Sequence, residues 1–499
     1  MKLNTKRTVL VGMAFFLISA FWQAYNAIVP LILTNHFGLS QFASGAVMSF
    51  DNILAVFMLP LFGAISDKVC TKKFGRRTPF ILVGTIAAVI AFVFLAFVDA
   101  VQFKALAEAG IHDRYVDAQT LLTEANDALK IAKNSGNAVD VDKAKNLVES
   151  AHATIDGIRA DAYALTMSNI GSIISFVGVL LVVLVSMATF RSPAVALMPD
   201  VTVKPLRSKA NAIINLTGTA GGILVLGLGI IFKTSRLSMQ YVGYVIAVVA
   251  IMLVGLIIFM FTVKEKRWSR EMEEETARLG LEEASSQGEE KEKRKLSRGE
   301  LHSLLLILAS VALWYIGYDS ITSKYSVYAV NVLGFDFNAT LIVAQAAAII
   351  SYIPVGILAS KIGRKKTILI GISLLASAFF IGNFITSNTP EVVMYPVFGL
   401  AGIGWATINV NSFPMVVELA RGGDVGKYTG YYYTASMAAQ IVAPILSGLL
   451  YVLFDIRYVF FAFGTVFVAL SFVTMFFVKH GDAKPIKKES VLENLDVED

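Results

Sequence analysis

Long apolar stretches separated by short polar segments run along most of the 499-residue chain. A helix needs roughly 20 apolar residues to cross a hydrocarbon layer about 30 Å thick, and stretches of that length recur throughout. We therefore predict an all-α membrane protein with twelve transmembrane helices. The predicted spans are 8–33, 42–66, 78–100, 168–199, 208–232, 241–263, 301–330, 339–360, 367–386, 392–417, 427–451 and 457–478.

Composition excludes an ordinary soluble domain, because 56% of the residues are hydrophobic, 16% are charged and the mean hydropathy is +0.66. The first span follows Lys2, Lys6 and Arg7 as in a signal peptide. Its apolar run is too long for one, and it has no clear small-x-small cleavage site, so we interpret it as the first helix. Cys70 is the only cysteine, so the chain cannot form an internal disulfide.

Lysine and arginine in the short loops predict the orientation, since basic residues near span ends stay in the cytoplasm. Such residues follow the second, fourth and eighth spans: Lys68, Lys72, Lys73, Arg76, Arg77, Lys204, Arg207, Lys209, Lys361, Arg364, Lys365 and Lys366. Both termini are then cytoplasmic, in a multi-pass protein that we expect in the plasma membrane. This clustering explains the formal charge of +6 better than nucleic-acid binding does.

Two segments are expected outside the bilayer. Residues 264–300 are crowded with Lys, Arg and Glu, and we interpret them as a solvated cytoplasmic linker or, alternatively, a regulatory partner site. Residues 101–165 are expected on the extracytoplasmic side as a two-helix hairpin with its break at 134–137. The hairpin is either an accessory elaboration or a surface for capture or docking. Its apolar residues at helical spacing are Leu121, Leu122, Ala125, Leu129, Ala132, Leu147, Ala151, Ile155 and Ile158.

The sequence repeats at corresponding places on either side of the charged linker. GAISDKVCTKKFGRRTPF at 63–80 resembles GILASKIGRKKTIL at 356–369, and each follows the second helix of its half. Such repetition indicates duplication of a six-helix unit. The predicted domains are an N-terminal bundle at 1–263, the linker at 264–300, a C-terminal bundle at 301–480 and a cytoplasmic tail at 481–499.

The repeated segments are candidate gating motifs. Gly63 and Gly356 would let neighbouring helices approach closely, and the basic run after each fixes its loop in the cytoplasm. Asp67 could bind the N-terminus of a neighbouring helix or pair with one of the arginines that follow, and Ser360 replaces it in the second copy. Setting the topology alone is the simpler alternative. The candidate gating residues are Gly63, Asp67, Gly75, Arg76, Arg77, Gly356, Gly363 and Arg364.

The first copy has the form GxxSD, seven residues, then GRRxPF. It resembles the longer helix 2–3 signature of the major facilitator superfamily, typical of sucrose–proton symporters and their glycoside–cation symporter relatives. Pro60, three residues before Gly63, also fits that group. The resemblance implies two six-helix bundles that rock about a central site while a proton or sodium ion drives a sugar across the membrane. We would expect a disaccharide or glucoside.

Charged residues inside the spans are candidates for ion coupling, since each is costly in lipid unless it faces a polar interior. They are Asp51, Asp319 and Arg191. The sixteen residues between Asp51 and Asp67 cover roughly 24 Å of helix, so Asp51 lies far from the cytoplasmic motif. Desolvation would favour its protonated form, as suits a proton carrier. Alternatively, Asp51 only forms hydrogen bonds. Asp319 could likewise form a static ion pair with Lys324 or Arg191.

Polar and aromatic residues in the spans are candidates for sugar binding, because sugars need hydrogen-bonding groups beside aromatic faces. They are Trp22, Gln23, Asn26, Asn52, Asn215, Asn409 and Asn411. Where the sodium-coupled branch of the family carries acidic residues in helix 2, this chain has Ala55 and Leu59, which favours protons over sodium.

The sequence contains no Walker loop, no clustered metal ligands and no GxSxG nucleophile elbow, so we expect neither an enzyme nor a cofactor. Export of a drug or metabolite, and a non-transporting sensor or scaffold, are the alternatives to sugar import. Buried charge disfavours a scaffold. The sequence names neither the sugar nor the oligomeric state, for which a monomer is the expectation.

Overall fold

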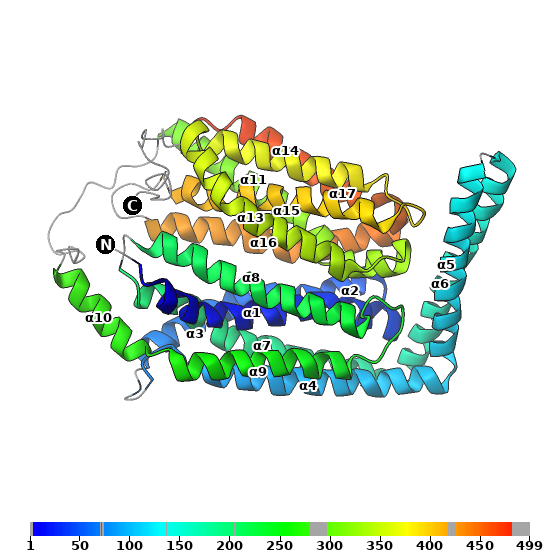
Figure 1. Cartoon of the computed structure of the whole chain (residues 1–499), viewed down its shortest axis with the longest axis horizontal. Coiled ribbons are helices and arrows are strands. Elements are labelled where there is room, and N and C mark those ends of the chain that lie inside the picture. The colour runs from blue at the N-terminus through cyan, green and yellow to red at the C-terminus, as the bar shows by residue number, and fades with distance from the viewer. Residues whose placement is uncertain are drawn as a thin grey trace.

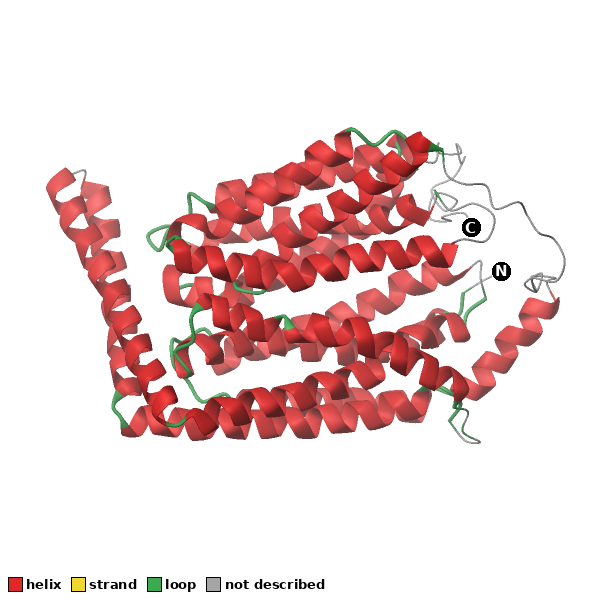
Figure 2. Ribbon diagram, turned by 180° about the vertical axis from the view of Figure 1, so that it is seen from behind, coloured by secondary structure: helices red, strands yellow, loops and turns green. Residues whose placement is uncertain are grey.

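The computed structural model describes residues 3–69, 71, 74–135, 137–203, 206–278, 297–417, 419 and 425–481. All elements of regular structure in these residues are helices. Two bundles lie side by side, with the chain termini at one end of the molecule and a long helical pair at the other (Figures 1 and 2).

The N-terminal half contains seven helices of the membrane bundle. They are α1 (Thr5–Leu31, continued by the π-helical turn η1, Ile32–His36), α2 (Gln41–Met48), α3 (Phe50–Lys68), α4 (Thr78–Glu108), α7 (Ile170–Asp200), α8 (Arg207–Phe232) and α9 (Val242–Thr262). The predicted second span is thus divided at Ser49 into α2 and α3. The Ser49 hydroxyl donates to the carbonyl of Gly45 at 2.8 Å, inside the preceding turn.

The C-terminal half contains α11 (Arg298–Thr322), α12 (Tyr325–Tyr328), η3 (Ala329–Leu333), α13 (Phe337–Ile362), α14 (Arg364–Gly382), η4 (Glu391–Val393), α15 (Met394–Val417), α16 (Val425–Leu453) and α17 (Ile456–Phe476). Eleven helices among the described residues are long and apolar enough to cross a membrane. α13 adds the apolar stretch Phe337–Tyr352. The predicted fold class is confirmed; the predicted seventh span ends earlier, as α11, followed by the short helices α12 and η3.

Matching helix pairs of the two halves pack closely through glycine. A Cβ atom added to Gly84 of α4 would lie 3.2 Å from the carbonyl oxygen of Ser186 in α7. One added to Gly371 of α14 would lie 3.0 Å from the carbonyl oxygen of Gly404 in α15. Small residues let transmembrane helices approach in this way, so both halves use the same device at corresponding interfaces.

The long pair at the end opposite the termini consists of α5 (Ile111–Ser135) and α6 (Ala138–Ser168), which pack against each other (Figure 1). The side chain of Asn137 caps α6 by accepting the backbone N–H of Val139 at 3.1 Å. Most of the apolar residues expected between these helices are buried, but Leu121 and Leu147 are 50% and 55% exposed. Leu121 lies next to the buried Leu122, and Leu147 lies next to the half-buried Val148.

Helix α10 (Glu265–Arg278) begins the segment expected to be a solvated linker. The structure differs from that expectation here, because Glu265 and Trp268 are buried against the N-terminal half. Residues 279–296 of the expected linker and nearly all of the predicted tail lie outside the described residues.

Candidate functional site

Charged residues from three helices approach one another inside the bundle. Asp51 on α3 lies close enough to Arg191 on α7 and to Asp319 on α11 for their charges to interact. The carboxylate of Asp51 accepts the backbone N–H of Asn52 at 2.6 Å and its side-chain amide at 3.0 Å. The structure therefore brings together all of the residues predicted for ion coupling, two from one half and one from the other.

Asp319 has an incomplete set of partners. Its Oδ2 atom is buried without a hydrogen bond, and the described residues show no ion pair to it within 4 Å. Lys324, one of the expected static partners, instead donates from Nζ to the backbone carbonyl of Gln41 at 3.1 Å. The ion pair between Asp319 and Lys324 is thus not formed in this conformation, which leaves the carboxyl group available to a mobile ligand.

Aromatic rings surround this charged group. The guanidinium of Arg191 lies 5.5 Å from the ring centre of Trp22. Tyr318 stacks on Trp405 with ring centres 3.8 Å apart and planes within 7°, and Tyr315 meets the same indole edge-on at 5.3 Å. Stacked rings beside carboxyl and guanidinium groups can bind the apolar face and the hydroxyls of a sugar.

The predicted substrate-binding residues separate into two groups. Gln23 accepts the side-chain amide of Gln345 at 2.5 Å, a bond from α1 to α13 across the two halves. Asn52 adds a long contact of 3.5 Å to the carbonyl of Gln440 on α16. These two residues contact the other half, whereas Trp22 contacts Phe21, Tyr25 and Arg191 of its own half.

The other four residues do not reach across the two halves through their side chains in the part of the chain that the structure describes. The amide of Asn215 donates to the carbonyl of Asn211 one turn earlier at 2.9 Å, and that of Asn411 donates to the carbonyl of Thr407 at 2.9 Å. The side chains of Asn26 and Asn409 are exposed. The geometry therefore gives these four asparagines no shared site in this conformation.

Arg77 is the centre of the first gating motif. Its guanidinium contacts Asp67 Oδ1 and Ser66 Oγ, each at 2.5 Å, and Asp200 Oδ2 at 2.8 Å. The pair between Asp67 and an arginine was one of the predicted alternatives. Arg76 is farther from Asp200, at 3.9 Å. Gly75, at φ 94°, supplies the left-handed turn that places the two arginines before α4.

The carboxylate of Glu265 caps the N-terminus of α4. It accepts the backbone N–H groups of Arg76, Arg77 and Thr78 at 2.6, 2.8 and 2.7 Å, and the hydroxyl of Thr78 at 2.7 Å. These donors are among the groups that a helix leaves without internal partners, and the helix dipole favours a negative charge there. Helix α10 is therefore fixed to the gating motif.

The second gating motif is built differently. Gly363 has φ 92° and precedes Arg364, which begins α14. Gly63 fits the expected close approach, because an added Cβ would lie 3.0 Å from Ser192 Oγ. Gly356 does not, because no described atom would lie within 4 Å of a Cβ there. Its expected role in close packing is wrong for this conformation.

Polar contacts join the two halves at the end that carries α5 and α6. Asn35 bonds Asn331 at 3.1 Å, and Ser235 donates to Asp336 at 2.5 Å. Deeper in the bundle, Ser326 donates to the carbonyl of Asn26 at 3.3 Å. These bonds close that end of the interface between the halves.

A family model described as Major Facilitator Superfamily matches residues 160–352 and 337–494. The chain belongs to this superfamily. A second model, described as MFS/sugar transport protein, matches residues 10–107. No curated protein matches the chain.

Solved structures of the superfamily share the fold along nearly the whole chain. The xylose transporter XylE from E. coli, in an inward-open conformation, has 12% identity and a TM-score of 0.55, with 99% of both chains covered. A D-xylose-proton symporter has 14% identity and a TM-score of 0.56, covering 96% of this chain and 98% of its own. The nucleoside transporter NupG has 13% identity and a TM-score of 0.51, covering 94% and 98%.

The sequence analysis did not identify several residues of the central site and of the first gating motif. Glu265 and Asp200 were not singled out, although each is an acidic residue at the end of a span. Tyr318 and Trp405 were missed because aromatic residues in an apolar helix usually indicate packing. Gln345, a polar residue inside an apolar helix, carried the same signal as Gln23.

Proposed function

We propose that this chain is a secondary active transporter that imports a sugar together with protons. The observation that carries the proposal is the approach of Asp51, Arg191 and Asp319 between the two halves, with an unsatisfied carboxyl oxygen on Asp319. Intramembrane ionisable groups mark ion pathways in transporters. A sensor or scaffold has no need of them.

The aromatic rings favour a sugar as the transported molecule. Tyr318 and Trp405 form a stacked platform close to the charged residues. The family description that matches residues 10–107 includes sugar transport, and the neighbours named above carry xylose or nucleosides, which share a sugar ring. We propose a disaccharide or glucoside, in line with the resemblance to sucrose-type symporters.

Alternating access is the proposed mechanism. If both termini are cytoplasmic in the plasma membrane, as we propose, the bonds around Asn35 and Asn331 would close the extracytoplasmic end, and the described conformation would face inward. Opening outward would break these bonds and bring the cytoplasmic ends of the halves together. Protons are favoured over sodium because Ala55 and Leu59 on α3 offer no oxygen ligands.

Uptake into liposomes that contain the purified protein tests this function. Labelled disaccharides and glucosides should accumulate when the outside is acidic, and a protonophore should abolish accumulation while removal of sodium has no effect. If no tested sugar accumulates and the pH gradient changes nothing, sugar–proton symport is rejected. Efflux of a drug or metabolite driven by the same gradient would support the exporter instead.

A further inference from the structure

A pocket with a volume of about 580 Å³ lies at the corner where α9 ends and α10 begins. Its lining is divided between apolar residues of the last turn of α9 and basic residues of the first turns of α10. The corner lies at the end of a membrane span, at the same end of the molecule as the chain termini (Figure 1). A pocket at this end of a span would lie at the level of the lipid headgroups.

Basic residues dominate the polar part of the pocket. Lys264, Lys266, Arg267 and Arg270 line it and all are exposed. Its two carboxylates are already engaged: Glu265 with the N-terminus of α4, and Glu271 with Arg7 and Arg267 at 2.5 and 2.7 Å. Hydrogen bonds from Arg267 and Arg7 lower the pKa of Glu271, so it stays ionised. The field that the pocket presents to a ligand is positive.

The apolar part continues onto the lipid-facing surface of α9. Met260, Phe261 and Val263 line the pocket, and Phe261 is 82% exposed. Ile257 and Ile258, one turn earlier, are 54% and 40% exposed. A ligand that places an anionic group on α10 would therefore have acyl chains lying along α9.

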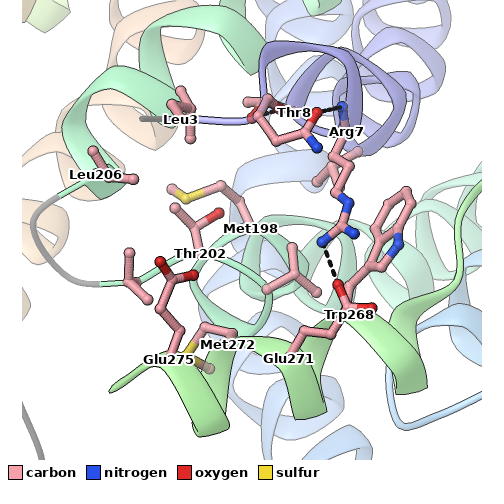
Figure 3. Close-up of a pocket in the computed structure, with 14 residues that line it drawn as sticks. Leu3, Arg7, Thr8, Met198, Thr202, Leu206, Trp268, Glu271, Met272 and Glu275 are labelled. Atoms are coloured by element: carbon pink, nitrogen blue, oxygen red, sulfur yellow. Dashed lines mark hydrogen bonds and ion pairs between the residues drawn. The ribbon is translucent and has the colours of Figure 1, made fainter. Parts of the chain in front are cut away.

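Helix α10 is held firmly enough to present these cations. Arg7 of α1 pairs with Glu271 and lies 5.4 Å from the ring centre of the buried Trp268. Figure 3 shows Arg7 reaching from α1 to this face of α10, beside a second, smaller pocket. The basic residues Lys264, Lys266, Arg267 and Arg270 line the larger pocket. Helix α10 therefore has one side bound to the rest of the protein and one side accessible to a ligand.

We propose that the α9–α10 corner binds an anionic phospholipid of the surrounding leaflet, with its phosphate on Lys264 and Arg270 and its acyl chains along α9. Charge complementarity and the adjoining apolar surface favour a lipid over a soluble phosphate, because a soluble phosphate has no apolar part to contact Phe261. Clusters of Lys and Arg next to a span attract anionic lipids in general. This site is separate from the central charged residues and does not depend on the transported molecule.

Native mass spectrometry of the purified full chain, titrated with phosphatidylglycerol, tests the site. The variant Lys264→Gln with Arg270→Gln removes two cations for which the described residues show no ion pair. It should bind the first phosphatidylglycerol roughly 10- to 30-fold more weakly than the unmodified protein. The matched control, Lys361→Gln with Lys366→Gln, removes two exposed cations beside the second gating motif and should bind phosphatidylglycerol unchanged.

Three results would overturn the proposal. They are equal binding by the two double variants, equally tight binding of phosphatidylcholine, and displacement of bound phosphatidylglycerol by inorganic phosphate. A phosphatidylglycerol with a photoreactive headgroup should label residues 260–270 in the unmodified protein. Labelling elsewhere only would equally reject the site. Neither measurement involves transport, so failure here leaves the sugar–proton proposal standing.

Discussion

The side-chain amide of Asn35 donates a hydrogen bond to the side-chain oxygen of Asn331 at 3.1 Å, across the two halves of the molecule. Both residues are buried, with 1% and 4% of their surfaces exposed. Asn35 also donates to the carbonyl of Leu237 at 2.8 Å and accepts Arg159 Nε at 3.3 Å. One asparagine thus links the closure of this end to helix α6, which carries Arg159.

Replacing Asn331 should make outward opening easier. In a Cys70→Ser background, Ser44→Cys provides a reporter, since Ser44 is fully buried at this end and its hydroxyl has no hydrogen-bond partner. A lost hydrogen bond is worth about 1 kcal/mol, so Asn331→Ala should label with a membrane-impermeant maleimide about fivefold faster. Asn137→Ala, at the far tip of the hairpin, is the control. Equal labelling rates in the Asn331→Ala and Asn137→Ala variants would show that the Asn35–Asn331 bond does not keep this end closed.

Asp319→Asn tests ion coupling. The amide cannot take up or release a proton, so accumulation driven by a pH gradient should fall to the equilibrium level. Exchange of labelled for unlabelled sugar across liposomes should continue, because it needs no net proton movement. Asp113→Asn, an exposed carboxyl on α5, is the matched control. Unchanged accumulation in Asp319→Asn would remove Asp319 from the mechanism.

Trp405 and Tyr318 offer a test of the sugar platform. Trp405→Ala removes the stacked ring and should raise the KM for uptake roughly tenfold, equivalent to about 1.4 kcal/mol. Trp405→Phe keeps an aromatic face and should retain most of the affinity. Uptake kinetics at saturating proton gradient measure both. Equal KM values for the Ala variant and the unmodified protein would place the sugar elsewhere.

Glu265 should contribute to stability as well as to the geometry of the gating motif. Its carboxylate is 4% exposed and accepts four hydrogen bonds at the start of α4. Glu265→Gln sets an amide NH₂ group against these donors and should cost about 2–4 kcal/mol, lowering Tm by several degrees. Glu274→Gln, exposed on the same helix, should leave Tm unchanged. Thermal unfolding of both variants in detergent measures these changes in Tm.

The helices were predictable from sequence because a chain in lipid must satisfy its backbone within each span, which forces long apolar stretches into helices. The central charges were predictable for the same reason, since Asp51, Arg191 and Asp319 are costly in lipid unless they meet. Glu265 was not, because its partner Arg77 is 188 residues away and no local pattern joins them. Aromatic stacking of Tyr318 on Trp405 likewise depends on how α11 and α15 are placed.

We expect transport to require the base of the α5–α6 hairpin but not its tip. Near the base, Tyr115 donates its hydroxyl to the carbonyl of Asn35 at 2.9 Å, and burial raises the pKa of Tyr115, so it remains a neutral donor. Deleting residues 123–150 and joining Leu122 to Ala151 through a short Gly-Ser turn keeps this bond and the Arg159 contact. We expect sugar accumulation in liposomes to be unchanged by the deletion.

Tyr115→Phe combined with Arg159→Gln removes both contacts with Asn35 while keeping the full hairpin. This variant should label faster at the Ser44→Cys reporter, as Asn331→Ala does, because Asn35 loses the groups that orient it. The two changes therefore separate the tip of the hairpin from its base. Lost accumulation in the shortened protein, with normal labelling in the double variant, would instead give the tip a direct part in capturing the transported molecule.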